Sequence, residues 1–461
     1  MKKAITLIGA ILFSTFFFKQ NIGLNLLLFT LVATAIMSIT NWKTFKNKTT
    51  IIKTVAYLVT GITVFLYKSE LAILANIIAF FTLVGSISEH KSSIYIKWIN
   101  GIYTTVVSFF AFYYDSLTVE VENAKKEKIN YGYWFKIIGI PAIIILIFVL
   151  LYRNANPVFD ELIAEIDLSF INFQWILFTG LGFYLFHNIT NPIQIEPITT
   201  NDLQQGNYLD KKAFQPISIE SLKNEKQLGV VLMVLLNTLI LFFIATDIVH
   251  LSKIHSMVAP QLSEQVHNGV NALIISNILA IIIILYFFRG SLNFFKRNKD
   301  LKNLTYVWIF LNLSVVIITM IKNVEYIVSF GLTYKRIGVL FFLTATSISL
   351  ITTFLKVSKL KNLSYLFRKN IQIAFVLFII STTLNWDKLI TEYNFNYAEQ
   401  LDIKYLINLS NNNTFLLKEY ADISEIDIRN KMKINRKYVK YMNDLRDNSW
   451  QEKVYDNFKI K

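Results

Sequence analysis

One stretch of the chain, from Asp247 to Arg336, places ionisable and amide side chains beside or inside long apolar segments. It opens with a polar, histidine-bearing segment, Asp247 to Asn268, that we expect to be a loop. Ionisable groups at lipid depth are costly, so they usually face a bundle interior or a water-filled path and mark a functional site. The candidate binding residues of this stretch are His267, Arg289, Lys322, Glu325 and Arg336.

Four of the five histidines lie between the expected seventh and ninth membrane spans, and they are His187, His250, His255 and His267. A zinc or non-haem iron site needs about three or four histidine or carboxylate ligands. With Asp247 and Glu264, the histidines supply enough ligands for a metal-dependent membrane oxygenase. No HxxxH or HExxH spacing is present, so the alternative is loop histidines at the membrane interface. We predict no cofactor.

Lys322 and Glu325 are three residues apart, so on a helix they share one face, where opposite charges pair. Either they form part of a proton or ion path, or the helix ends near Ile321 and they lie at the interface. The basic segment around Arg289 also has two interpretations. It binds anionic lipid headgroups, or it sets the topology through the positive-inside effect. That segment comprises Arg289, Lys296, Arg297, Lys299 and Lys302.

The apolar residues predict an all-α fold, a polytopic transmembrane helix bundle. Hydrophobic residues make up 54% of the 461 positions and charged residues 17%. The apolar residues form blocks of about 18, which is typical of membrane-spanning helices. Strands of a β-barrel would alternate apolar and polar residues, and these blocks do not. We expect about twelve spans and a multi-pass protein of the bacterial inner (plasma) membrane.

Residue character along the chain predicts the domain organisation. A transmembrane domain, residues 1–385, contains a polar loop at 190–226, and a small helical tail outside the lipid follows at 386–461. We also expect an amphipathic surface helix at 160–170. The first apolar block resembles a signal peptide, but no small-x-small cleavage site follows it, so we expect it to be retained. The expected spans are 5–18, 22–39, 51–66, 71–86, 94–114, 133–151, 173–189, 228–246, 270–288, 304–321, 337–355 and 371–384.

The formal net charge of +15 is spread over many short loops. That distribution favours contact with the lipid bilayer and its anionic headgroups over nucleic-acid binding. Early basic loops such as Lys43 to Lys48 and late ones such as Arg289 to Lys302 predict opposite orientations when spans are counted between them. We follow the denser late loops and expect the tail on the outer face. The absence of cysteine excludes disulfides and thiolate chemistry.

Several short motifs occur in an order that resembles one protein family. They are Asn156-Pro157-Val158-Phe159, His267-Asn268-Gly269-Val270, Phe288-Arg289-Gly290-Ser291-Leu292-Asn293-Phe294, Gly331-Leu332-Thr333-Tyr334-Lys335-Arg336, Asn385-Trp386-Asp387, Tyr393-Asn394 and Tyr405-Leu406. In these motifs the chain resembles the domain-of-unknown-function 4153/4173 family of polytopic bacterial membrane proteins, Bacteroidetes type. The resemblance implies a helical membrane fold but no agreed activity. Some similar chains are labelled as carotenoid-cleaving monooxygenases, which is why the oxygenase alternative stays open.

We therefore predict a non-enzymatic role in transport, sensing or envelope maintenance, through a polar site near the eighth to tenth spans. One alternative is a metal-dependent membrane oxygenase. Another is a membrane scaffold that docks a protein partner through its C-terminal tail. No phosphate-binding loop, dinucleotide fingerprint or nucleophile elbow occurs in the sequence.

Overall fold

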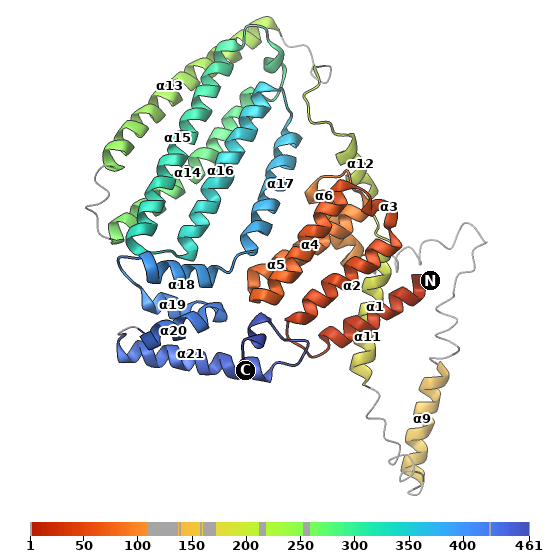
Figure 1. Cartoon of the computed structure of the whole chain (residues 1–461). Coiled ribbons are helices and arrows are strands. Elements are labelled where there is room, and N and C mark those ends of the chain that lie inside the picture. The colour runs from red at the N-terminus through yellow and green to blue at the C-terminus, as the bar shows by residue number, and fades with distance from the viewer. Residues whose placement is uncertain are drawn as a thin grey trace, which may run out of the picture.

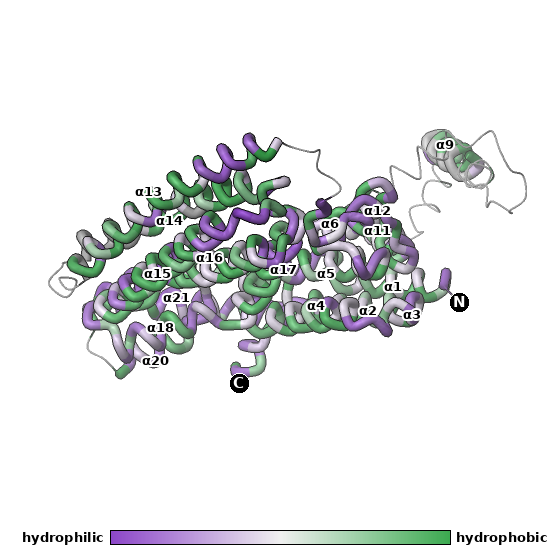
Figure 2. Tube along the Cα trace, turned by 90° about the horizontal axis from the view of Figure 1, so that it is seen from above, coloured by the Kyte–Doolittle hydropathy of each residue, from purple (hydrophilic) through white to green (hydrophobic). Residues whose placement is uncertain are grey.

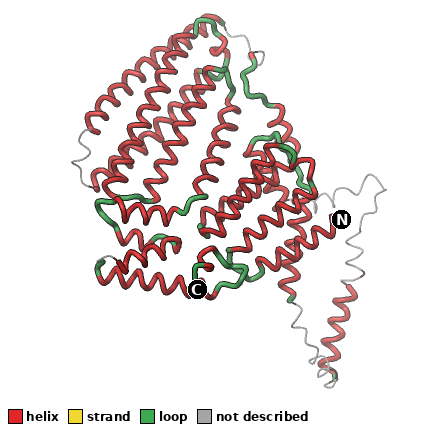
Figure 3. Tube along the Cα trace, viewed as in Figure 1, coloured by secondary structure: helices red, strands yellow, loops and turns green. Residues whose placement is uncertain are grey.

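The computed structural model describes residues 2–107, 137, 140–156, 159, 172–211, 218–251, 259–423 and 426–460. Within these ranges the side chains of 142, 143, 146, 150, 154, 250, 251, 259–268 and 277 are not described. Helices and the turns between them make up the described part, which contains no strand (Figures 1 and 3). The predicted all-α class is confirmed.

Helices from the first part of the chain pack into one bundle, which we call the first bundle. Phe29, Tyr57, Leu83 and Phe186 lie in its core. A four-residue helix, α3 (Trp42–Phe45), connects two of its members. The others are α1 (Lys2–Phe17), α2 (Leu24–Thr40), α4 (Lys48–Tyr67), α5 (Glu70–Ser88), α6 (Ile94–Ile102), the π-helical turn η1 (Tyr103–Val107) and α11 (Phe173–Thr190).

Small and amide residues let the helices of the first bundle approach one another. A Cβ at Gly85 would lie 1.9 Å from the carbonyl oxygen of Lys97, so α5 and α6 cross with their backbones in contact. The buried Asn76 amide donates to the hydroxyls of Thr30 (3.1 Å) and Thr60 (3.2 Å) on two neighbouring helices. Close packing at small residues and hydrogen bonds between helices are the usual glue of helices in lipid.

A second bundle is built from long helices in the middle of the chain, around Met233, Phe288, Leu301 and Val316. Its helices are α13 (Ile219–Leu251), α14 (Ala259–Phe287), α15 (Lys299–Phe330) and α16 (Tyr334–Ser358). The next helix, α17 (Leu363–Thr382), joins the two bundles. Its Asn370 amide donates to the hydroxyl of Ser349 on α16 (3.2 Å), whereas its Phe375 belongs to the core of the first bundle.

Seven of the described helices are long and apolar enough to cross a membrane, namely α4, α5, α13, α14, α15, α16 and α17. In Figure 2, hydrophobic residues run along α13 to α17 and hydrophilic residues gather at helix ends. These helices support a multi-pass membrane protein, although not the predicted count of about twelve spans. Parts of the expected spans at 94–114 and 133–151, and the surface helix expected at 160–170, lie outside the described residues; α9 (Ile140–Ala155) covers part of the second span.

Two segments predicted to be loops contain long stretches of helix. Between Asp247 and Asn268, α13 continues to Leu251 and α14 begins at Ala259. The segment 190–226 contains α12 (Glu196–Gln204) and the first turns of α13. At 33 residues, α13 is longer than a span needs, since about 20 residues cross a bilayer, so polar turns prolong it. The interpretation that a helix ends near Ile321 is also wrong, because α15 continues to Phe330.

Four helices follow α17 and lie together at one end of the molecule (Figure 1). The first of them begins at Trp386, where the sequence becomes polar. Ile390, Leu406 and Leu417 form their core, and Ile337 of α16 packs into it. These helices are α18 (Trp386–Tyr397), α19 (Ile403–Asn408), α20 (Thr414–Ile423) and α21 (Ile428–Asp447).

The last residues of the chain return to the first bundle. The amide of Leu24 donates to the carbonyl of Lys453 (2.8 Å), and the amide of Asn25 donates to that of Gln451 (2.8 Å). Gly23 has no room for a side chain, because a Cβ there would lie 2.1 Å from the Glu452 carbonyl oxygen. The C-terminal helices are thus fastened to both bundles.

Candidate functional site

Early and late basic loops lie at the same end of the bundle, opposite α18 to α21 (Figure 1). Asp202 of α12 connects an early segment to a late one at this end, because it binds both Ser93, in the α5–α6 loop, and Arg368 of α17. Near the N-terminus, Lys2 donates to Asn191 at the same end (3.0 Å). Counting spans along the sequence puts the early and late basic loops on opposite sides, but in the folded chain they share one side. We call this end the basic end.

A cavity of about 510 Å³ opens at the basic end between α4, the α5–α6 loop, α12 and α17. We call it the basic cavity. Its one carboxylate, among the lining residues that the structure describes, is Asp202. The cationic lining residues are Lys53, Lys91, Lys97, Arg368 and Lys369. An excess of cations in a hollow surface favours an anionic occupant.

Asp202 and Arg368 hold one wall of the basic cavity together. The carboxylate accepts hydrogen bonds from the Ser93 amide (2.7 Å) and the Tyr95 hydroxyl (3.0 Å), and the Arg368 guanidinium lies 3.1 Å from it. Burial alone would raise the pKa of Asp202, but these hydrogen bonds and the Arg368 charge outweigh it and hold that pKa below its ordinary value. The carboxylate stays ionised at neutral pH, and its contribution to stability is lost only as the pH falls through the lowered pKa. Arg368 is therefore neutralised inside the protein.

The two buried lysines of the cavity differ in their partners. Lys97 is 4% exposed and its ammonium donates to the carbonyls of His90 (3.0 Å) and Ser92 (2.8 Å). Lys53 is 7% exposed, and its ammonium lies 4.7 Å from the centre of the Phe375 ring. No described residue accepts a hydrogen bond from Lys53 or pairs with its charge. A largely buried cation without a protein acceptor has to obtain one from whatever occupies the cavity, or it destabilises the protein.

Lys322, a predicted binding residue, forms an ion pair between membrane-spanning helices. Its ammonium on α15 contacts the carboxylate of Asp247 on α13, and the two side chains are 14% and 12% exposed. Asp247 lies on another helix, whereas Glu325, the residue expected to pair with Lys322, is half-buried on α15 itself. The pair ties α13 to α15.

Arg289 lies far from the other predicted binding residues that the structure describes. Arg289 precedes α15, whereas Lys322 lies roughly six turns into that helix, about 35 Å further along its axis. Arg289 lies over the Tyr286 ring (4.1 Å) and 3.7 Å from Glu225. Arg336, at the far end, donates to the carbonyl of Phe330 (2.7 Å), so it caps α15. The side chain of His267 is outside the described part.

Of the four proposed metal ligands, the structure describes the side chain of His187 alone. His187 lies on α11 and stacks on Phe183, with ring centres 6.3 Å apart. His250 lies on α13 with its side chain not described, as for His267 on α14, and His255 lies outside the described residues. The described residues contain no group of three histidine or carboxylate side chains that could hold a metal ion.

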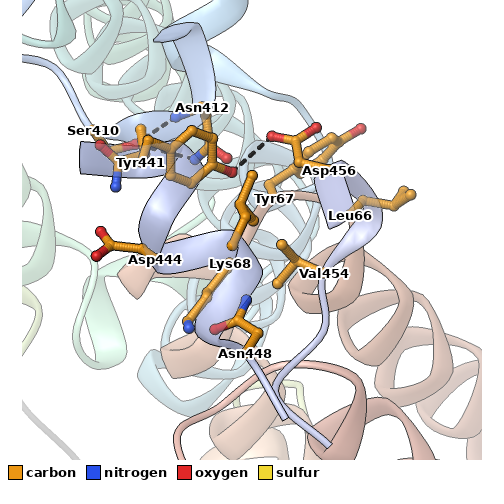
Figure 4. Close-up of a pocket in the computed structure, with 12 residues that line it drawn as sticks. Leu66, Tyr67, Lys68, Ser410, Asn412, Tyr441, Asp444, Asn448, Val454 and Asp456 are labelled. Carbon is orange, nitrogen blue, oxygen red and sulfur yellow. Dashed lines mark hydrogen bonds between the residues drawn. The ribbon is translucent and has the colours of Figure 1, made fainter. Parts of the chain in front are cut away.

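A second, smaller cavity of about 250 Å³ lies at the opposite end, between the α4–α5 turn and α21 (Figure 4). Tyr67 and Lys68 line it from the first bundle. On the other side, the Tyr441 hydroxyl donates to Asp456 (2.8 Å), and burial raises the pKa of Tyr441. Lys459 binds the same carboxylate (2.7 Å). Because residues of the first bundle line one side and residues of the C-terminal helices line the other, we regard this cavity as a joint between them.

With this geometry in place, comparisons with known proteins identify the family. The family model named Domain of unknown function (DUF4153) matches residues 5–420. The chain belongs to the DUF4153 family. Comparisons with curated proteins and with solved structures gave no match.

Several motifs that resemble the DUF4153 family meet where α18 joins the second bundle. Gly331 has a positive φ of 81°, and a Cβ there would lie 2.5 Å from Asn394 Oδ1. The Asn394 amide donates to the carbonyl of Leu332 (2.9 Å). The Tyr334 hydroxyl donates to the buried Asp387 carboxylate (2.7 Å). These motifs therefore build a joint between the α15–α16 turn and the C-terminal helices.

Sequence reasoning on this DUF4153 chain missed Lys53, Asp202 and Arg368 as site residues. One signal was available, because Lys53 is a lone lysine near the start of the apolar block 51–66. An ionisable residue inside such a block is a candidate functional residue by itself. No comparable signal marks Asp202 or Arg368, which lie in ordinary polar segments.

Proposed function

We propose that this DUF4153 protein is a non-enzymatic membrane protein of the transport or sensing type that binds an anionic ligand in the basic cavity. The observation that carries the proposal is Lys53, whose residue is 7% exposed and whose ammonium lines the cavity without an acceptor among the described residues. Its charge also repels that of Lys97. A bound anion would supply the missing acceptor and screen this repulsion.

The position of the cavity supports a role in coupling. α17 lines it through Arg368 and Lys369 and also holds the two bundles together. Ligand sites occur preferentially between packed units. A ligand that contacts Lys53 on α4 and Lys369 on α17 would bias how the bundles sit against each other, which both sensing and transport require.

We also propose an orientation in the bacterial inner membrane. The basic loops share one end, so the positive-inside effect places the basic cavity on the cytoplasmic side. Residues 386–461 then form an extramembrane domain on the outer face. In the scaffold alternative, a protein partner would have to bind a surface of this domain that does not already contact the bundles.

The proposal predicts that Lys53→Met stabilises the ligand-free protein. Single stabilising substitutions commonly add about 0.5–2 kcal/mol, and removal of a charge without a protein partner should fall in that range. We expect a higher thermal unfolding midpoint in detergent after lipid removal, and failure of the variant to complement a deletion strain under envelope stress. Lys48→Met, on the exposed first residue of α4, is the matched control and should leave both readouts unchanged. A destabilised Lys53→Met that complements fully would refute an anion site at Lys53.

Metal analysis separates this proposal from the oxygenase alternative. We expect iron and zinc far below one atom per chain in protein purified without chelators, measured by plasma mass spectrometry. Stoichiometric metal that is lost from a His250→Ala or His267→Ala variant would favour the oxygenase instead, because those histidines would then act as ligands.

A further inference from the structure

We propose that the anion bound in the basic cavity is a phosphate group, carried by the headgroup of an anionic glycerophospholipid. This inference rests on the proposed function, since it names the ligand of the same site. Three observations support it. They are the lysine ammonium groups that line the cavity, the exposed side chain of Ile52 in its wall, and the contacts that Arg368 already makes within the protein.

The unused donors are lysine ammonium groups. Lys53, whose residue is 7% exposed, supplies a cation with no described acceptor, and the exposed Lys91 and Lys369 lie on other parts of the lining. Ammonium groups bind as point charges whose donors rotate, so several of them suit the tetrahedral oxygens of a phosphate. A planar carboxylate would be better matched by a free guanidinium, and Arg368 is not free.

Arg368 is a positioning residue. Its guanidinium binds Asp202 (3.1 Å), the Gln205 carbonyl (2.7 Å) and the Asn207 side chain (3.0 Å). These contacts hold α12 against α17 and use the donors that would otherwise reach a ligand. The cation that remains for a ligand deep in the cavity is Lys53.

The outward wall of the cavity points to a lipid as the source of the phosphate. Ile52 lines the cavity, is 61% exposed and belongs to α4, which is apolar enough to span a membrane. Lys53 is the next residue, within the second turn of that span. An apolar surface beside a buried cation near the end of a span fits an amphiphile whose phosphate lies at headgroup depth and whose chains follow α4.

The test uses the full chain in detergent with native lipids removed. Its arms are inorganic phosphate, sulfate, short-chain phosphatidylglycerol and phosphatidylcholine with the same chains, at one ionic strength. Binding is measured by native mass spectrometry and by the shift of the thermal unfolding midpoint. We expect phosphatidylglycerol to bind and stabilise wild type, and phosphatidylcholine and sulfate to have little effect. Lys53→Met should weaken phosphatidylglycerol binding by about tenfold to a hundredfold, the loss of one charge-assisted hydrogen bond.

Two further variants keep the result interpretable. Lys53→Arg retains the charge and should recover most of the binding, whereas Lys48→Met should match wild type. Stabilisation by inorganic phosphate alone would overturn the lipid source and leave a soluble phosphate as the ligand. Equal binding of phosphatidylglycerol to wild type and Lys53→Met would overturn the inference. If no phosphate arm binds while Lys53→Met still stabilises the ligand-free protein, the phosphate assignment fails and the proposed anion site stands.

Discussion

Gly85→Leu is expected to prevent the first bundle from packing. A Cβ at this position would lie 1.9 Å from the carbonyl oxygen of Lys97, which is backbone and cannot rotate away. Overpacking usually costs about 1–3 kcal/mol, and a backbone collision should exceed that range. Because stabilities of folded proteins are about 5–15 kcal/mol, the variant should give little monodisperse protein in detergent and a much lower thermal unfolding midpoint.

Gly338→Leu is the matched control for this prediction. Gly338 lies on α16, and no heavy atom lies within 4 Å of a Cβ placed there. The substitution adds the same side chain to another candidate span, so it should leave yield and midpoint near those of wild type. Equal behaviour of the two variants would show that α5 and α6 do not pack as closely as the structure indicates.

Lys322→Met should strongly destabilise the second bundle. It leaves the Asp247 carboxylate, whose side chain is 12% exposed, without its cation between α13 and α15. Removing one partner of a buried ion pair costs about 3–5 kcal/mol, whereas replacing both partners by apolar residues is often neutral. We therefore expect the double variant Lys322→Met/Asp247→Leu to recover most of the loss. Thermal unfolding of the wild type, both single variants and the double variant measures the coupling energy.

The control for the second prediction is Lys335→Met, at an exposed lysine beside the start of α16. It should change stability little. If Lys322→Met costs no more than a surface ion pair, about 0–1 kcal/mol, the pair is solvated and does not tie α13 to α15.

Helices were predictable because their signal is local. The apolar blocks 71–86 and 337–355 fall inside α5 and α16, since a run of apolar residues at lipid length must satisfy its backbone within a helix. Loops were less predictable. The polar segment from Asp247 to Asn268 is mostly helical. Polar side chains indicate that a segment contacts water, but they do not indicate whether its backbone is helical.

The candidate site was less predictable than the helices. Arg289, Lys322 and Arg336 are near one another in sequence, which suggested one site. The 32-residue helix α15 lies between Arg289 and Arg336, so Arg289 is far from Lys322 and Arg336 along the helix axis. Each residue then meets a different partner, so the predicted set divides into an ion pair between helices, a helix cap and a turn.

The sequence by itself determined that ionisable residues lie in and beside membrane-length apolar blocks, because composition and block length do not depend on tertiary contacts. Only the tertiary structure decided which of those residues share a site. Lys53, Asp202 and Arg368 lie on separate segments of the chain and meet because α12 and α17 fold against the first bundle. The same folding brings early and late basic loops to one end, which depends on contacts between distant segments that no local pattern records.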